Sequence, residues 1–274
     1  MRWQCFFRVL ALTLVAAARA QDVRVSKPGG EKSAVDFSGL AVSADAPART
    51  FVQVLRADLL RSGGFTAAAP GRGEFRLTGS VSGASALEAR VEALNAATGR
   101  RIFGKSYSVS AAEARRLAHV VADEIVQAAT GRPGFASSRL AVIGRRGTAK
   151  ELFVCDSDGA NLLQVTRDNS ISLYPRWSPD RARIVYTSYI KRFPDVLMIE
   201  LATGARTRIA GYPGLNAGGA LSPDGRAAAL VLSRDGNPDI YVKRLADGAL
   251  SRITNTARAA ESSPSWSPDG RQLV

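Results

Sequence analysis

Few residues of this chain have a type and spacing that could do chemistry. The only histidine is His119, and a single imidazole without a partner histidine, cysteine or nearby carboxylate pair is more often structural. The motifs His-Glu-x-x-His, Gly-x-Ser-x-Gly and Cys-x-x-Cys are all absent from the 274 residues. The sequence therefore predicts no catalytic residue, no metal ligand and no cofactor, and it favours a binding scaffold.

The aspartates that most resemble ligands belong to a repeated corner. Ser178-Pro179-Asp180 returns as Ser222-Pro223-Asp224 and as Ser267-Pro268-Asp269, at steps of 44 and 45 residues. Proline presets φ in a tight turn, and aspartate can bond the amides of its own turn. Because the aspartate recurs in every unit, we expect it to shape the turn and not to hold a ligand.

Short strand patterns follow each corner. Three glycine turns recur at the same spacing as the corners but at other positions of the repeat: Asp158-Gly159, Thr203-Gly204 and Asp247-Gly248. A period near 45 residues with about four strands is typical of a β-propeller blade. The alternative, a Greek-key sandwich with regularly spaced turns, would not repeat a corner in register. About three blades are present, too few to close a ring, so the sequence predicts a propeller that is incomplete at its C-terminal end.

The first 20 residues are typical of a secretory signal peptide. A short positive start precedes a mostly apolar run, and Ala18-Arg19-Ala20 before Gln21 has the form of a cleavage site. The alternative, a membrane anchor, needs about 20 apolar residues, whereas Arg8 and Arg19 bracket only ten. We therefore expect cleavage near Ala20/Gln21 and export of a protein that does not span the membrane.

Residues 21–135 alternate between strand and helix patterns. Strands are predicted at 35–42, 75–78, 87–93 and 102–109. One helix is predicted from an Asp45 cap through Phe51, Leu55 and Leu59 to Gly63; a second follows a Ser110–Glu113 capping box, carries the stripe Leu117, Val121, Ile125 and Ala128, and ends at Gly131. The sequence thus predicts an α/β N-terminal domain at 21–135, followed by an all-β propeller at 136–274.

The formal net charge is +13, but the basic residues are scattered among acids. A nucleic-acid-binding protein more often shows a clustered stripe of lysine and arginine with interleaved aromatic residues. We therefore expect no nucleic-acid partner, and we interpret the charge as favouring solubility and a mild attraction to anionic partners or surfaces.

A signal peptide, a small α/β domain that ends in a helix and tandem Trp-Ser-Pro-Asp-Gly blades together resemble the TolB family of the periplasmic Tol–Pal system. The helix and its exit at residues 54–65 are similar to those of the family, and so is the junction from Ser106 to Ala141. One departure is Leu215-Asn216-Ala217, where familiar members carry His-Asn-Gly.

The resemblance implies an N-terminal α/β domain with a six-bladed propeller, no catalysis, a monomer in the periplasm, and a role in outer-membrane integrity and envelope constriction at division. The implied partners are the peptidoglycan-associated lipoprotein (Pal), which the propeller receives, and TolA. The family's extended amino terminus takes part in signalling toward TolA, which assigns Val23 and Val25 to that contact.

A partner-binding surface is predicted where the chain leads into each corner, at 171–175, 214–219 and 259–264. The corners repeat closely while these lead-ins share almost no residues, and variation at fixed positions of a scaffold is typical of recognition; unconstrained loop drift is the alternative. The candidate contact residues are Leu173, Tyr174, Leu215, Asn216, Glu261 and Ser262. Tyr174 is the expected anchor, because an aromatic ring offers a large contact area at small entropic cost.

A second hypothesis is the propeller domain of a secreted hydrolase or lyase whose catalytic part is missing from this sequence. Peptidases of that kind need a nucleophile elbow, and lyases need several histidines in the blades. The blades contain neither, so the scaffold hypothesis is the leading one.

Overall fold

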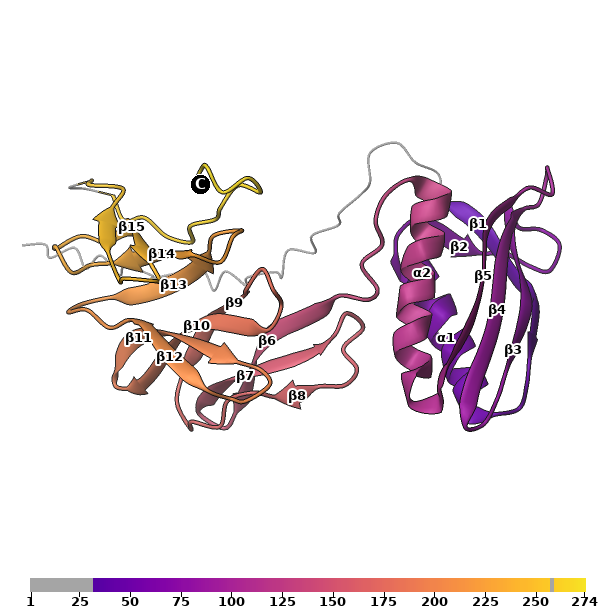
Figure 1. Ribbon diagram of the computed structural model, residues 1–274, viewed down its shortest axis with the longest axis horizontal. Helices are drawn as coiled ribbons and strands as arrows, with labels where there is room; N and C mark the ends of the chain where they lie inside the picture. The colour runs from indigo at the N-terminus through magenta and orange to yellow at the C-terminus, as the bar shows by residue number, and fades with distance from the viewer. Residues whose placement is uncertain (1–31, 257–258) are drawn as a thin grey trace, which may run out of the picture. The chain divides into compact units, whose positions relative to one another are not determined.

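Two helices and a five-stranded sheet form the α/β part, residues 33–130, of the computed structural model, which describes residues 32–256 and 259–274. The strands are β1 (Ser33–Val42), β2 (Phe65–Ala67), β3 (Phe75–Ser82), β4 (Ala86–Asn95) and β5 (Arg101–Ser110), in the order β2-β1-β3-β4-β5. β1 is parallel to β2 and β3, and β3, β4 and β5 form an antiparallel meander. The helices α1 (Ala46–Arg61) and α2 (Ala114–Thr130) lie on one face of this sheet (Figure 1).

Burial of one face explains why both helices form here. Phe51, Leu55 and Leu59 are completely buried, as their spacing predicts. On α2 the stripe from Leu117 to Ile125 is buried, but Ala128 is exposed, and the buried face continues at Val126. Near its C-terminal end, α2 therefore covers the core with a slightly rotated face.

The predicted helix starts differ from the structure. Asp45 precedes α1 but makes no capping bond; its carboxylate accepts from the Ser43 hydroxyl (2.6 Å) and the Gly83 amide (3.2 Å). Before α2, the Ser110 hydroxyl donates to the Glu113 carboxylate (3.2 Å), and a 3-10 turn replaces the predicted capping box. In both cases a nearby side chain competes for the group that would otherwise cap an amide.

Antiparallel sheets form the propeller part, residues 139–274, and confirm the predicted blades (Figure 1). The first sheet contains β6 (Arg139–Arg146), β7 (Ala149–Asp156) and β8 (Leu163–Gln164). The second contains β9 (Ser172–Trp177), β10 (Arg183–Lys191), β11 (Phe193–Glu200) and β12 (Arg206–Ala210). The third contains β13 (Asn216–Leu221), β14 (Ala227–Leu232), β15 (Asp239–Arg244) and β16 (Leu250–Arg252). An isolated bridge joins Trp266 and Leu273 on the two sides of the third corner.

The Ser-Pro-Asp corners serve turn geometry, as predicted. The Ser178 hydroxyl donates to the Asp180 carboxylate, which also accepts from the Ala182 amide (3.0 Å), and the same pattern recurs at Asp224 and Asp269. These bonds, first that of Ser178, then those of Ala182 and Arg183, lower the pKa of Asp180 to about 2. The carboxylate therefore stays ionised and bonded at neutral pH.

Neighbouring sheets pack through apolar side chains and one close backbone approach. Val185 and Val196 of the second sheet share a buried cluster with Leu221 and Leu230 of the third. A Cβ placed on Gly219 would lie 2.4 Å from Val185 Cγ1, so only glycine allows this approach. Residues 32–274 form one compact unit, and the domain boundary at 135/136 stays a prediction.

Neither helix of the described ranges is both long enough and apolar enough to cross a bilayer.

Candidate functional site

A residue with a left-handed φ recurs in the segment that leads into each corner. Tyr174 (φ 54°), Gly218 (φ 52°) and Ser263 (φ 54°) occupy this position, at steps of 44 and 45 residues. On β9 the register shifts between Arg176 and Leu173, and on β13 it shifts between Ala217 and Ala220. The left-handed conformation is therefore a property of the repeated unit, although its three residue types have nothing in common, and on β9 and β13 it coincides with a bulge.

Tyr174 is the residue for which this conformation is most costly. A left-handed φ costs a residue with a Cβ roughly 1–2 kcal/mol, and glycine avoids that cost at the equivalent Gly218. The Tyr174 side chain is nevertheless 57% exposed, so burial of the ring does not offset the strain. An exposed aromatic ring on a strained backbone is a candidate binding residue.

Exposed apolar side chains lie at the same end of the second sheet and, with Tyr174, define the blade-2 rim: Ile171 (38% exposed), Ile190 (46%) and Phe193 (76%). The chain turns between β10 and β11 there, and the Tyr189 amide donates to the Ile171 carbonyl (2.9 Å). Ile190 and Phe193 were not predicted from the sequence. The available signal was an apolar pair that flanks the polar turn residues Lys191 and Arg192.

The bulges of adjacent sheets are linked. β9 and β13, the first strands of the second and third sheets, lie next to each other. The Gly218 amide donates to Thr187 Oγ1 (3.2 Å) on β10 of the second sheet. Residues at the bulge positions of the two sheets can therefore contribute to one continuous surface.

Asn216 is in the wrong environment for a contact residue. It is 1% exposed; its amide nitrogen donates to the carbonyls of Tyr212 (2.7 Å) and Gly214 (3.2 Å), and its oxygen accepts from the Tyr212 amide (2.8 Å). Asn216 therefore closes the loop into β13, which corrects the prediction that its side chain touches a partner.

The remaining predicted contact residues are more accessible. Ser262 is exposed, and Leu173 and Leu215 are half-buried. Glu261 is also half-buried, and its carboxylate accepts from the Thr256 hydroxyl (2.6 Å). Val23 and Val25 lie outside the described residues, so their assignment stays a prediction.

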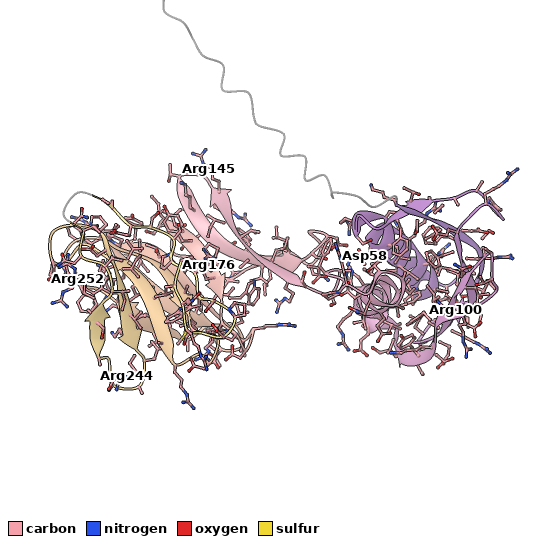
Figure 2. The ribbon with its side chains drawn as sticks, turned by 90° about the horizontal axis from the view of Figure 1, so that it is seen from above. Asp58, Arg100, Arg145, Arg176, Arg244 and Arg252 are labelled. Carbon is pink, nitrogen blue, oxygen red and sulfur yellow. The ribbon has the colours of Figure 1, made fainter. Side chains whose placement is uncertain are left out.

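Charged side chains are distributed over both parts of the molecule (Figure 2). Arg100 projects from the α/β part, and Arg145, Arg244 and Arg252 project from the propeller part. Two of these cations pair with acids: Arg244 with Asp247 (2.9 Å), and Arg252 with Asp239. The arginines labelled in Figure 2 therefore do not form a continuous basic stripe.

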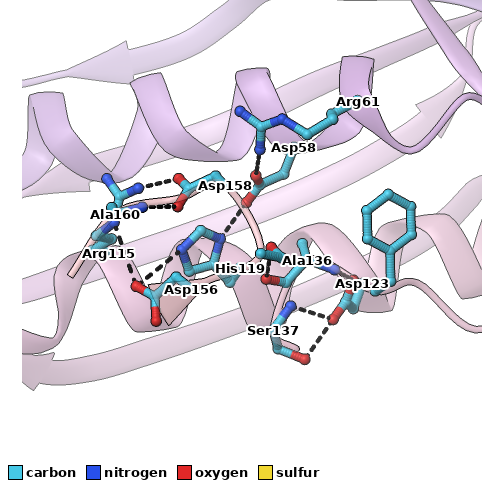
Figure 3. A network of polar contacts seen from close by, with 12 residues as sticks. Asp58, Arg61, Arg115, His119, Asp123, Ala136, Ser137, Asp156, Asp158 and Ala160 are labelled. Atoms are coloured by element: carbon cyan, nitrogen blue, oxygen red, sulfur yellow. Dashed lines mark hydrogen bonds and ion pairs between the residues drawn. The ribbon is translucent and has the colours of Figure 1, made fainter. Parts of the chain in front are cut away.

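A second polar site surrounds His119 on α2, where the sequence predicted no carboxylate partner. Asp58 of α1 lies 2.6 Å from His119 Nδ1, and Asp156, at the end of β7, lies 4.0 Å from Nε2 (Figure 3). Arg115 is bonded to Asp158 in the β7–β8 turn. The sequence did not indicate this cluster because Asp58 lies 61 residues before His119 and Asp156 lies 37 residues after it, and no short motif spans them.

A buried acid also recurs once in each sheet, and this repeat was not predicted from the sequence. Glu151, Asp195 and Asp239 stand 44 residues apart near the start of equivalent strands and are 1%, 8% and 0% exposed. Glu151 accepts from the Thr166 hydroxyl and the Asn169 amide (2.8 Å). Its role is to hold the backbone between β8 and β9, and this places it among structural residues.

Comparison with known proteins gives consistent matches along the chain. The PD40 family, described as the TolB beta propeller domain, matches residues 126–274. The protein TolB homolog of Chlorobium chlorochromatii is 32% identical over 208 residues, which are 74% of this chain and 46% of that protein. The Tol-Pal system protein TolB of Gluconobacter oxydans is 32% identical over 184 residues, or 66% and 41% of the two chains.

A solved structure matches both parts of the molecule. The crystal structure of TolB from Acinetobacter baumannii superimposes with a TM-score of 0.80 at 26% identity and covers 89% of this chain and 65% of that one. The chain spans less than half the length of the curated relatives that it matches.

Proposed function

This chain belongs to the TolB family, and we propose that it serves the Tol–Pal system as a non-catalytic interaction scaffold that maintains outer-membrane integrity and supports envelope constriction at division. The names of its relatives support the system. The propeller of a hydrolase or lyase has less support, because the one histidine lies on α2 and not on a blade.

The observation that carries the proposal is the strained, exposed Tyr174 on the blade-2 rim. Three further exposed apolar side chains lie at the same end of the sheet, and exposed apolar side chains gathered at one place favour a protein-binding site. We propose that this rim contacts the peptidoglycan-associated lipoprotein, with Tyr174 as the anchor and with Leu173, Leu215, Glu261 and Ser262 as flanking contacts. TolA is the proposed partner of the segment that holds Val23 and Val25, and the chain is proposed to act as a monomer.

Calorimetric titration tests the lipoprotein contact. The full chain is titrated with the soluble domain of the peptidoglycan-associated lipoprotein from the same organism, and we expect saturable binding of one partner per chain. A parallel titration with an unrelated periplasmic protein of similar charge controls for nonspecific attraction to the basic surface. Equal heats in the two titrations would contradict the proposal.

The proposed location is the periplasm, with cleavage near Ala20/Gln21. The small-x-small residues before Gln21 support it. Expressed in a Gram-negative host, the chain should be released with the periplasmic fraction, and mass spectrometry should show a product that begins within a few residues of Gln21. An intact Met1 in the membrane fraction would contradict this proposal.

A further inference from the structure

A groove of about 530 Å³ lies between the second and third sheets of the propeller part, at the end where the corners lie. Arg183, next to the first corner, lines one side, and Arg226, next to the second corner, lines the other. The blade-2 rim is at the opposite end of β10 and β11, where Ile190 and Phe193 stand. The groove, called the basic groove below, is therefore separate from the proposed lipoprotein contact.

Strand pairing explains which side chains of the third sheet face the basic groove. The Leu245 amide donates to the Arg226 carbonyl (2.9 Å), and Lys243 is opposite Ala228. Ala228 is buried in the cluster that the third sheet shares with the second. Because side chains alternate between the two faces of a sheet, Arg226, Lys243 and Leu245 lie on this same face.

The floor of the basic groove is apolar and its walls are cationic. Met198 and Leu245 pack against the buried cluster that joins the two sheets, and Ile209 belongs to that cluster. Among the described residues, no acidic side chain lines the groove. The cationic side chains that line it are Arg183, Arg208, Arg226, Lys243 and Arg244. This lining suits an anion that also has an apolar part.

Two of these five cations have no acidic partner. The other three lie near carboxylates: Arg183 near Asp180 (2.6 Å), Arg208 near Asp195 (3.8 Å) and Arg244 near Asp247 (2.9 Å). Arg226 and Lys243 form no ion pair with a carboxylate of the described ranges, since Asp224 accepts from the Arg226 amide (3.0 Å) and not from its guanidinium group. Five cations with three acidic partners leave a surplus of two positive charges.

The first and second sheets show that a blade does not need these cations for packing. Their equivalent positions lie 44 residues earlier, because Gln164 pairs with Phe153 as Arg208 pairs with Leu197. The positions equivalent to Arg208, Arg226, Lys243 and Arg244 hold Gln164, Ala182, Ile199 and Glu200. The positive charge is therefore specific to the basic groove.

We propose that the basic groove binds a phosphate monoester carried on an apolar group. A phosphate monoester has a charge of about −1.5 to −2 at pH 7, which matches the surplus of two. The Arg226 guanidinium group can bind two phosphate oxygens at once. Lys243 Nζ donates to the Ile209 carbonyl (2.7 Å) and keeps two further protons for the phosphate.

The apolar group of the ligand would lie on Met198 and Leu245 at the floor. The volume of the groove is within the about 300–1,000 Å³ that is typical of small-molecule sites, so a small ligand fits better than an acidic peptide. This inference goes beyond the scaffold function and does not rest on it. A lipid headgroup and a soluble phosphorylated molecule share the required chemistry, and the test below separates them.

The test is calorimetric titration of the full chain with phenyl phosphate, which joins a phosphate monoester to an apolar ring. Inorganic phosphate and tetraglutamate are the comparisons. We expect one site per chain and binding of phenyl phosphate at least about 10-fold tighter than binding of either comparison. Flotation with phosphatidylcholine vesicles, with and without phosphatidic acid, identifies the source. Flotation that requires phosphatidic acid supports a lipid ligand, and phenyl phosphate binding without flotation supports a soluble one.

Variants that install the residues of the first pair of sheets test the contacts. Arg226→Ala should weaken phenyl phosphate binding about 10-fold, and the double variant Arg226→Ala, Lys243→Ile about 100-fold. The matched control is the double variant Arg100→Ala, Arg145→Ala, which removes the same charge from exposed positions outside the groove and should bind as the unaltered chain does.

Three results would each overturn the proposal: no saturable binding of phenyl phosphate, tighter binding of tetraglutamate, or equal losses in the groove variants and the control. Melting temperatures of all variants show whether each one folds. Should Lys243→Ile lower the melting temperature, Arg226→Ala decides alone, because Arg226 is exposed and its substitution leaves the packing between the sheets intact.

Discussion

The Tyr174→Gly variant should bind the lipoprotein domain about 10- to 100-fold more weakly without any loss of stability. Binding weakens because the anchor ring is removed from the blade-2 rim. Stability is expected to stay level or rise by up to about 1 kcal/mol, because glycine adopts the left-handed conformation without strain. Calorimetric titration measures the first effect, and urea unfolding measures the second.

Arg181→Gly is the matched control for this prediction. Arg181 (φ 57°) stands in the first corner where the other two corners have Gly225 and Gly270, and it lies at the opposite end of β9 from Tyr174. The substitution should relieve a similar strain while leaving lipoprotein affinity unchanged. Equal affinities in both variants would remove Tyr174 from the interface, and a destabilised Tyr174→Gly would show that the ring supports the fold.

The propeller could be predicted from the sequence because its corners depend on residue type. Proline, aspartate and glycine have particular turn geometries, so the corners at Ser178, Ser222 and Ser267 are visible as a repeated string. The left-handed position before each corner repeats just as regularly, but it is occupied by tyrosine, glycine and serine. A conformation that the surrounding sheet imposes on any residue leaves no signal in a single sequence.

The site at His119 could not be predicted for a different reason. Its geometry depends on how α1, α2 and the β7–β8 turn pack, which brings Asp58 and Asp156 to the same imidazole from distant parts of the chain. The predicted helix caps were wrong for a related reason. Asp45 and Ser110 bond to a side chain or to a distant amide, and not to the helix amides that local capping rules assign to them. Contacts that form only in the tertiary structure cannot be predicted from the spacing of residues along the chain.

Glu151→Ala should cost about 2–4 kcal/mol of unfolding free energy, the largest stability loss that we predict. The substitution removes a buried carboxylate and leaves the Thr166 hydroxyl and the Asn169 amide without their acceptor. Asn169 has a left-handed φ of 51°, and its amide bond to Glu151 is made in that conformation. Urea unfolding of the full chain, followed by circular dichroism, gives the measurement.

Glu200→Ala provides the matched control, because Glu200 is exposed and bonds only the hydroxyl of Thr203 in its own turn (2.7 Å). Its loss should stay below about 1 kcal/mol. Thr166→Val completes a double-mutant cycle. If Glu151 acts through Thr166, the double variant should lose less unfolding free energy than the sum of the two single losses, by about 0.5–3 kcal/mol. Additive losses, or equal losses at Glu151 and Glu200, would show that the buried acid does not hold the chain between β8 and β9.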